Sequence, residues 1–234
     1  MLQVLRSAER GFADHGWLKS HHTFSFADYD NPAWVHYGPL RVINDDYVAP
    51  GQGFGKHGHR DMEILTYLLE GELEHKDSMG NGSVIRPGDV QRMSAGTGVM
   101  HSEFNPSPDQ QVHLLQVWII PSAERLPPGY EQKHFTSADK RGRLRLIAAP
   151  GGVEGAVAIN QDARVYAGLF SGTESQQFAL GAGRRAWAHV ARGALAVNDA
   201  QLAAGDAAYV EGPANLKFHD GRDAEVLLFD LPWN

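Results

Sequence analysis

The sequence predicts an all-β protein that contains two barrel-like domains. Short apolar or alternating runs bounded by turn residues recur along the chain, among them 63–70, 112–120, 165–170 and 226–231. Such runs at regular spacing are typical of β-barrels and β-sandwiches. The 26 glycines and 12 prolines among the 234 residues favour many turns. No segment keeps a helical apolar period over several turns, so long helices are not expected.

Composition divides the chain into two halves. Ten of the 12 histidines lie in residues 1–134, whereas 21 alanines lie in 138–234 and only 7 before them. The proline-rich stretch 121–130 separates the two compositions and reads as a connector. We therefore expect an N-terminal domain over residues 1–133 and a C-terminal domain over residues 134–234.

A weak internal repeat indicates that the two domains are similar. Residues 69–73 (LEGEL) resemble residues 191–195 (ARGAL), and both read as a strand, a turn glycine and a second strand. Further along, 87–90 (PGDV) corresponds to 204–207 (AGDA), where a Gly-Asp turn leads into a strand. The repeat favours two tandem barrels over one large sheet.

Charge and residue usage exclude several classes of protein. The chain has no cysteine, which excludes disulfides, cysteine-ligated zinc and a cysteine nucleophile, and which fits the cytoplasm. The net charge is −7 and no long basic run is present, so we expect no nucleic-acid partner. The N-terminus is too polar for a signal peptide, and no apolar stretch is long enough for a membrane-spanning helix. We expect a cytoplasmic monomer.

Two pairs of residues with strand spacing predict a metal site. His57 and His59 alternate and so share one face of a strand, and His101 and Glu103 repeat this spacing. A lone His-x-His pair is weak evidence, because such pairs also occur on polar strand faces. Two such strands side by side would present three imidazoles and a carboxylate, which suits one divalent first-row metal.

These motifs resemble those of a known family. The pattern from Gly51 through His57, His59 and Glu63 resembles the first cupin motif, and Gly98 with His101 and Asn105 resembles the second. The whole chain resembles the pirin family, and within it the bacterial pirin-like quercetin 2,3-dioxygenases. The stretches that carry the resemblance are 15–18 (HGWL), 22–26 (HTFSF), 40–46 (LRVINDD), 93–98 (MSAGTG) and 101–105 (HSEFN). The resemblance implies a bicupin, with two tandem cupin β-barrels of jelly-roll type and iron in the first.

Two carboxylates compete for the fourth ligand position. Many cupins use the glutamate of the first motif, here Glu63, whereas the resemblance to pirins implies Glu103. We therefore expect His57, His59, His101 and Glu103 to hold one metal ion, and Glu63 to support the site by orienting an imidazole. The resemblance implies Fe²⁺, although Zn, Ni, Cu, Mn and Co also accept this ligand set. No other cofactor-binding residue is expected.

The second half lacks the ligands. Transferring the spacing of the first motif onto the repeat in the second half gives Ala179 and Gly181, and the third ligand position falls on Phe218. We expect a metal-free C-terminal barrel, in which His189 and His219 are structural.

Other polar residues receive simpler interpretations. His113 alternates within an apolar strand and is expected to be a hydrogen-bonded core residue. His75 follows two glutamates and is expected at a solvated strand end, whereas Asp45 and Asp46 read as turn residues.

The resemblance also implies a function. Pirin-like quercetinases are metal-dependent dioxygenases that cleave the flavonol quercetin with O₂ and release carbon monoxide and a depside. Glu103 would then be a catalytic base for the substrate hydroxyl. A flavonol requires an apolar, aromatic-lined pocket, for which Phe24, Phe26, Phe54, Met62 and Met93 are candidates.

Three alternatives remain open. Eukaryotic pirins also resemble this chain, and they imply an iron-dependent regulatory protein that binds a protein partner without turnover. A structural zinc barrel would unfold on metal removal and bind no substrate. An enzyme acting on another substrate is the third alternative, since cupin barrels host many chemistries.

Overall fold

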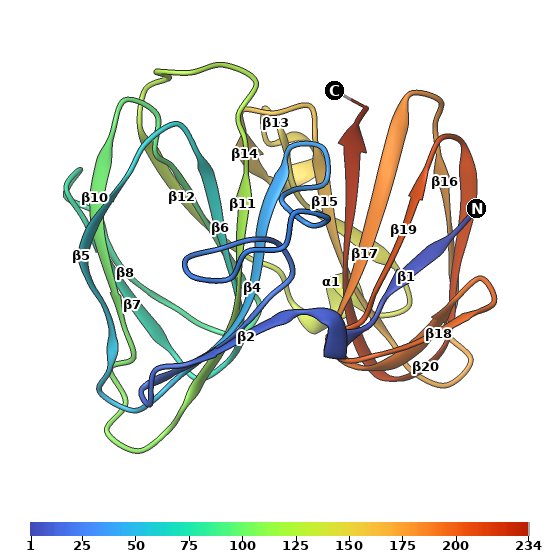
Figure 1. Ribbon diagram of the computed structural model, residues 1–234, viewed down its shortest axis with the longest axis horizontal. Coiled ribbons are helices and arrows are strands. Elements are labelled where there is room, and N and C mark those ends of the chain that lie inside the picture. Colours follow the sequence, from blue (N-terminus) through green and yellow to red (C-terminus); the bar gives the residue numbers. More distant parts are fainter. Residues whose placement is uncertain (234) are drawn as a thin grey trace. The chain divides into compact units, whose positions relative to one another are not determined.

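A computed structural model describes residues 1–233, and β-strands make up almost all of its regular structure (Figure 1). The predicted all-β class is confirmed. The chain forms two compact units, each discontinuous in sequence. The N-terminal unit contains Arg10–His134 and Val157–Gln161, and the C-terminal unit contains Met1–Glu9, Phe135–Ala156 and the chain from Asp162 onward. The boundary expected between residues 133 and 134 stays a prediction.

The N-terminal unit consists of two antiparallel sheets, which Figure 1 shows in blue to green. The seven-stranded sheet has the order β12 (Gly129–His134), β9 (Asp89–Ser94), β6 (Glu63–Glu70), β11 (Val112–Ile119), β4 (Leu40–Val48), β3 (Leu18–His22) and β2 (Gly11–Asp14). The four-stranded sheet has the order β5 (Gly53–His59), β10 (Val99–Phe104), β7 (Leu73–Asp77) and β8 (Gly82–Ile85). The short strand β14 (Val157–Ile159) also belongs to this unit.

One face of the seven-stranded sheet carries a row of polar side chains between two apolar layers. Residues that pair directly across five neighbouring strands form this polar row: His22, Asn44, Gln116, Thr66 and Gln91. On β6 and β11 the positions two residues away on the same face are apolar, whereas β3 and β4 place Ser20 and Asp46 there. On one side lie Leu68 and Leu114, in a cluster with Val48 and Ile85, and on the other side lie Ile64 and Trp118, in a cluster with Met93. Strand alternation thus places polar side chains between two apolar layers on β6 and β11.

The C-terminal unit is a second β-structure around its own core. Its strands are β1 (Gln3–Leu5), β13 (Leu144–Pro150), β15 (Arg164–Phe170), β16 (Gln176–Leu180), β17 (Arg184–Val197), β18 (Ala200–Ala203), β19 (Ala207–Glu211) and β20 (Ala214–Pro232). The long strands β17 and β20 pair with each other through several register shifts, and such bulges bend strands around a barrel. Their inner faces bury small and branched side chains together with Phe170 and Phe218.

Helical structure is confined to short connections. A single turn, α1 (Ser137–Lys140), begins at Thr136, whose hydroxyl accepts from the Asp139 amide while the Asp139 carboxylate accepts from the Thr136 amide. Short 3-10 turns cover Ser7–Glu9 and Val153–Gly155. Within residues 1–233 no helix is both long and apolar enough to cross a membrane.

Two sequence interpretations are settled by the position of β4. Asp45 and Asp46 are not turn residues, because both are buried in the middle of this strand. Asp45 is paired with His113, whose Nε2 lies 2.7 Å from the Asp45 Oδ1, and with Arg10 at 3.3 Å. His113 is therefore the hydrogen-bonded core residue that its apolar strand predicted.

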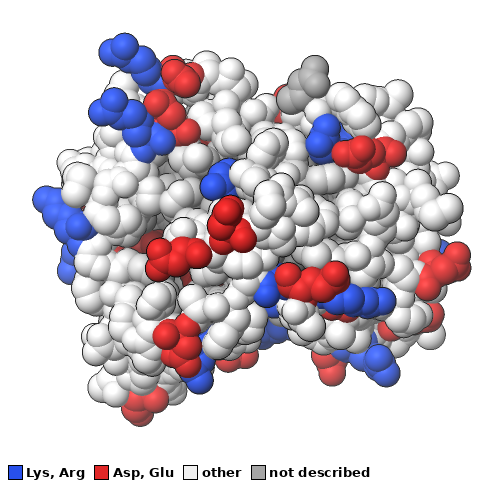
Figure 2. Space-filling view, in the orientation of Figure 1, with Lys and Arg blue, Asp and Glu red and all other residues white. Residues whose placement is uncertain are grey.

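The surface carries both signs of charge. Figure 2 shows Lys and Arg side chains interspersed with Asp and Glu on the face in view. On this face the charges form no continuous basic surface of the kind that nucleic-acid phosphates bind.

Candidate metal centre

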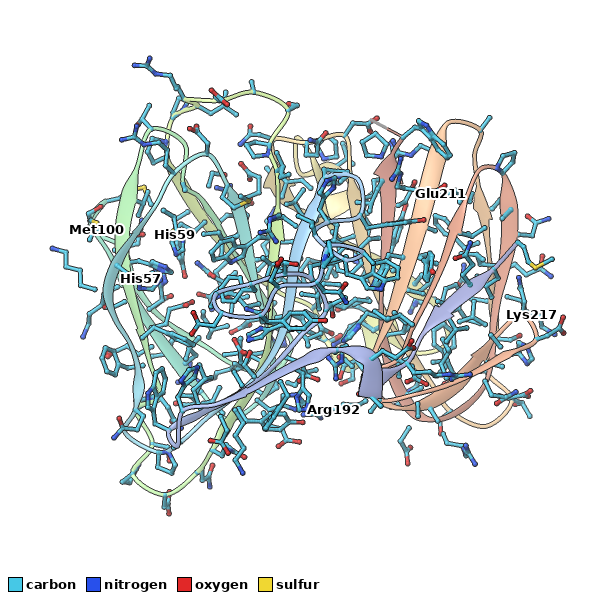
Figure 3. All side chains as sticks on the ribbon, in the orientation of Figure 1. His57, His59, Met100, Arg192, Glu211 and Lys217 are labelled. Atoms are coloured by element: carbon cyan, nitrogen blue, oxygen red, sulfur yellow. The ribbon has the colours of Figure 1, made fainter. Side chains whose placement is uncertain are left out.

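The predicted histidines meet where β5 pairs with β10. In this antiparallel pair His57 lies directly opposite His101, and His59 lies opposite Val99. The three imidazole rings converge, with centroids 4.4 Å apart for His57 and His101 and 4.9 Å apart for His59 and His101. In Figure 3, His57 and His59 point from β5 toward the interior of the unit, whereas Met100 lies on the outer side of β10. Because successive side chains of a strand point to opposite faces, the candidate ligand His101 is buried while its neighbour Met100 is exposed.

Glycines allow the two strands to approach this closely. A Cβ on Gly53 would lie 2.2 Å from the carbonyl oxygen of Glu103, so no other residue fits there without moving a backbone. The pairing shifts register between His101 and Glu103, which marks a β-bulge in this pair. In the turn before β10, Gly96 has a φ of 45°, and a Cβ would lie 2.0 Å from the Leu126 carbonyl oxygen. Steric exclusion of a side chain thus explains why the first position of the Gly-x-Gly turn is a glycine.

The ring nitrogens are oriented for a cation. The Nδ1 of His57 lies 2.7 Å from the carbonyl oxygen of Gly55, which can only accept, so Nδ1 carries the proton. In the tautomer that this hydrogen bond selects, the lone pair is on Nε2, which lies 3.0 Å from the Nε2 of His101. A backbone carbonyl that fixes the tautomer of an imidazole is typical of metal-ligating histidines.

Burial keeps the imidazoles of His59 and His101 neutral. Burial lowers the pKa of His101 to about 3, and the neighbouring His57, His59 and His75 lower it further. Burial, followed by His57, lowers the pKa of His59 to about 4. Because a metal binds only the deprotonated ring, both histidines are ready to bind a cation at neutral pH.

Glu103 is a buried carboxylate with two neutral hydrogen-bond donors. Its side chain is 2% exposed; the hydroxyl of Thr66 donates to Oε1 at 3.3 Å and the amide of Gln116 donates to Oε2 at 3.1 Å. Burial raises the pKa of Glu103 to about 7, with Asp46 adding to the effect and both donors opposing it. A bound cation would supply the positive charge that this carboxylate lacks among its hydrogen-bond partners within residues 1–233.

The four predicted ligands fall into two overlapping groups. The ligand atoms of His57, His59 and His101 all lie within 4.8 Å of one another, as do those of His75, His101 and Glu103. His101 belongs to both groups. The nitrogen and carboxylate donors, their neutral rings and the uncompensated carboxylate fit a divalent metal ion.

His75 is a histidine whose position the sequence predicted wrongly. It is fully buried on β7, directly opposite Glu103, rather than at a solvated strand end. Its Nε2 lies 3.3 Å from the Asp77 carboxylate, and its ring lies 5.3 Å from that of His101. The available signal was alternation: His75 has the same parity as the buried Leu73, whereas the intervening Glu74 is part-exposed.

Glu63 lies apart from the imidazoles because β5 ends before this residue and β6 belongs to the other sheet. Strand β5 ends at His59, Asp61 in the connection has a φ of 47°, and Glu63 begins a strand of the other sheet. The carboxylate of Glu63 accepts from the Ser94 hydroxyl at 2.7 Å and from the Asn160 amide at 3.0 Å. These bonds join Glu63 to Ser94 of β9 and to Asn160, and within residues 1–233 no hydrogen bond joins its carboxylate to an imidazole.

A cavity of about 440 Å³ opens beside the imidazoles. Its walls include the aromatic side chains of Trp17, Phe26, Phe54 and Trp118. His57, His59, Glu103 and Gln116 supply polar groups. Ligand sites are typically of this size, mostly apolar and furnished with a few polar groups.

Two of the five predicted lining residues are confirmed. Phe26 and Phe54 line the cavity, but Phe24, Met62 and Met93 do not. Phe24 is buried next to Trp34, and both methionines pack in the apolar cluster around Ile64. Trp17 and Trp118 were missed, because only the folded sheet brings these distant positions to one face.

In the C-terminal unit the histidines have other surroundings. Both groups of potential metal ligands found within residues 1–233 lie in the N-terminal unit. The ring of His219 lies 2.8 Å from the Asp220 carboxylate and 2.9 Å from the carbonyl oxygen of Asn198. His189 is buried in β17. A metal-free second barrel stays a prediction.

Comparison with known proteins places this site in a family. Residues 4–119 match the family described as Pirin, and residues 146–231 match the quercetinase C-terminal cupin domain. The chain is 43% identical over 232 residues to quercetin 2,3-dioxygenase of Escherichia coli K12, covering 99% of both chains. It is 39% identical over 221 residues to a pirin-like protein of Caulobacter vibrioides, covering 94% of this chain and 95% of that one.

Solved structures agree with this relationship. The crystal structure of YhhW from Escherichia coli matches with a TM-score of 0.94 at 43% identity, covering 99% of this chain and 98% of that chain. The structure of bacterial pirin YhhW in complex with nickel(II) matches with the same TM-score at 42% identity, covering 99% of each chain. The present chain, with two tandem cupin barrels and a cluster of buried and half-buried histidines and a glutamate in the first, belongs to the pirin family.

Proposed function

We propose that this protein is a metal-dependent dioxygenase that cleaves the flavonol quercetin at its 2,3 bond with O₂, releasing carbon monoxide and a depside. The observation that carries the proposal is the cluster of His57, His59 and His101, linked through His101 to a second group that contains Glu103. His57, His59 and Glu103 line an aromatic-walled cavity of about 440 Å³. Relatives at 43% identity over nearly the full chain that bear the name quercetin 2,3-dioxygenase support it.

His57, His59, His101 and Glu103 would hold the metal ion. These residues offer nitrogen and oxygen donors without a thiolate, a set that several first-row metals accept. We keep Fe²⁺ as the expected resident metal, and the nickel(II) complex of YhhW shows that a relative takes nickel. When bound, the metal would polarise a substrate oxygen and favour loss of its proton.

Glu103 would accept the proton of the substrate hydroxyl. Its carboxylate lines the cavity, and each oxygen accepts one described hydrogen bond, so lone pairs remain for a ligand. The Thr66 hydroxyl and the Gln116 amide hold the carboxylate in place from the facing sheet. A general base needs a proton within hydrogen-bond reach, and a hydroxyl at this end of the cavity meets that requirement.

The aromatic walls would bind the rest of a flat substrate. Trp17 packs edge-on against Phe54 with centroids 5.3 Å apart, and Phe26 packs edge-on against Trp118 at 5.4 Å. Aromatic faces bury large apolar area with little loss of side-chain freedom and exclude water from the reacting end. The shape and chemistry of the cavity thus suit a polycyclic aromatic molecule.

The test is carbon monoxide release from quercetin in air by protein loaded with iron. We expect release by the wild type, loss of release in His101→Ala, and unchanged release in the matched control His36→Ala, whose ring is exposed. Protein that holds one equivalent of iron and releases no carbon monoxide would contradict the proposal. That result would favour the pirin-type regulatory role, in which the metal state controls binding of a protein partner.

The expected cytoplasmic location and monomeric state stay predictions. The expected location rests on the composition of the chain, which contains no cysteine.

A further inference from the structure

A second polar group lines the cavity from the sheet opposite the histidine strands. Asp46 lies in the middle of β4, directly opposite Ser20 of β3, and the Ser20 hydroxyl donates a short hydrogen bond to its Oδ1. Both residues line the cavity, although Asp46 is only 3% exposed. They come from β3 and β4, whereas the predicted metal ligands come from β5 and β10.

Two further side chains complete this group. The Nδ1 of His22 lies 2.9 Å from the Asn44 Oδ1 and 3.3 Å from the Ser20 hydroxyl. His22 and Asn44 also line the cavity. We call Ser20, His22, Asn44 and Asp46 the β3–β4 polar patch. Next to it, Phe26 lies 5.3 Å from the ring of His22, so an aromatic wall borders the patch.

Asp46 has hydrogen-bonding capacity that the protein leaves unused. Its Oδ1 accepts from Ser20, but within residues 1–233 its Oδ2 has no hydrogen-bond partner. Burial raises the pKa of Asp46 to about 7; the Ser20 hydrogen bond opposes this rise and Asp45 adds to it. A buried carboxyl group without full hydrogen bonding costs free energy, and the residue opposite it on β11 is the apolar Leu114. Packing alone would therefore be served better by an apolar residue.

The patch lies beside the metal centre but does not belong to it. Gln116 pairs directly with Asn44 across β4 and β11, and its amide donates to the Glu103 carboxylate. One strand spacing, about 5 Å, thus separates Gln116, which donates to Glu103, from Asn44 of the patch. A rigid molecule with two or more hydroxyls on fused rings can reach both polar groups at once.

We propose that the β3–β4 polar patch, with Asp46 as its main acceptor, binds a second phenolic hydroxyl of the substrate and so selects polyhydroxylated over singly hydroxylated flavonols. This inference rests on the proposed function. A phenol both donates and accepts, so its O–H can donate to Asp46 Oδ2 while its oxygen faces the donors of the patch. The aromatic walls next to the patch hold the ring that carries this hydroxyl. Such a site lowers the affinity for a flavonol without the second hydroxyl, because that ligand leaves a buried polar group unpaired.

The test compares the binding of two flavonols by metal-loaded protein without oxygen, so that no turnover occurs. Quercetin carries hydroxyls on several rings, whereas 3-hydroxyflavone keeps only the hydroxyl expected at the metal. Dissociation constants are measured by fluorescence titration for the wild type, Asp46→Asn and Asp46→Leu. The matched control is Asp109→Asn, an exposed aspartate outside the cavity. Metal content and circular dichroism establish that each variant is folded and loaded.

We expect Asp46→Asn to weaken quercetin binding about 10- to 100-fold and Asp46→Leu to weaken it at least as much. Binding of 3-hydroxyflavone should stay within about twofold in both variants, and Asp109→Asn should bind both flavonols like the wild type. Equal weakening for both flavonols, or weakening for neither, would overturn the subsite and leave the proposed function standing. A wild type that holds metal but binds neither flavonol would overturn the substrate class as well.

Discussion

The Nε2 atoms of His57 and His101 face each other at 3.0 Å across the β5–β10 pair. His57 comes from a glycine-rich strand and His101 from a strand that follows a Gly-x-Gly turn. Their approach depends on register, because a shift by one residue would turn either ring to the outer face of the sheet.

Replacing His101 should remove the metal and leave the fold intact. His101→Ala deletes the ligand common to both groups, so bound metal should fall to about a tenth of the wild-type content or less. Metal-bound wild type should also melt at a higher temperature than the variant, because a ligand that binds only the folded state stabilises it. Elemental analysis and thermal melting test both points. A variant that still holds one equivalent of metal would contradict the ligand assignment.

Substitutions of Glu103 and Glu63 should distinguish a metal ligand from a residue with a structural role. Glu103→Gln keeps both hydrogen-bond partners within reach but removes the charge, so metal affinity should fall and carbon monoxide release should drop by about 10²- to 10⁴-fold. Glu63→Gln should leave metal content unchanged, since its carboxylate bonds to Ser94 and Asn160. The comparison requires metal content and turnover for both variants. Loss of metal in Glu63→Gln with retention in Glu103→Gln would reverse the assignment.

The glycine at the start of β5 should be sensitive to a methyl group. Gly53→Ala places a Cβ 2.2 Å from the Glu103 carbonyl oxygen, which forces β5 away from β10. We expect a loss of about 1–3 kcal/mol of unfolding free energy together with weaker metal binding. Gly82→Ala is the control, because nothing lies within 4 Å of its Cβ position and its φ is not positive. Urea unfolding of both variants tests the prediction, and equal stability would contradict it.

In the C-terminal unit, Asp206 should make stability depend on acid pH. Burial acts to raise the pKa of Asp206, but hydrogen bonds from the amides of Ser7 and Ala203 and from the Arg6 guanidinium outweigh it and lower the pKa below its usual value. The folded state therefore releases this proton more readily than the unfolded chain. The stabilisation is present above the unfolded pKa near 3.8 and is lost as pH falls through the lower folded value.

The measurement is the unfolding free energy of wild type and Asp206→Asn as a function of pH. The variant should be less stable at pH 7 by about 1–2 kcal/mol, and the difference should shrink below about pH 4. A difference that is constant across this range would show that the Asp206 charge contributes nothing. Asp109→Asn, at an exposed loop position, should show no difference at either pH.

Several features of the fold and site follow from local sequence. Strand alternation predicted that His57 and His59 share a face and that His101 and Glu103 do so, and the buried positions on β10 alternate in this way. Turn glycines such as Gly96 were recognisable because only a residue without a side chain fits a positive φ beside a backbone carbonyl. These features depend on a few neighbouring residues, so a single sequence contains them.

Other features depend on which strands become neighbours. His75 looked solvated beside Glu72 and Glu74, but β7 pairs with β10 and buries His75 opposite Glu103. Asp46 looked like a turn residue, but it lies inside a continuous strand whose partners are 26 positions earlier and 68 positions later, at Ser20 and Leu114.

The sequence by itself determined the kind of chemistry: imidazole and carboxylate donors at strand spacing, an all-β fold and two tandem barrels. Only the tertiary structure decided which polar groups meet: His75 beside Glu103, Glu63 away from the imidazoles, and the β3–β4 polar patch in the same cavity. The physical reason is that side-chain periodicity is a local property of a strand. Register and pairing, in contrast, arise from the burial of whole sheets, which involves residues far apart in the chain.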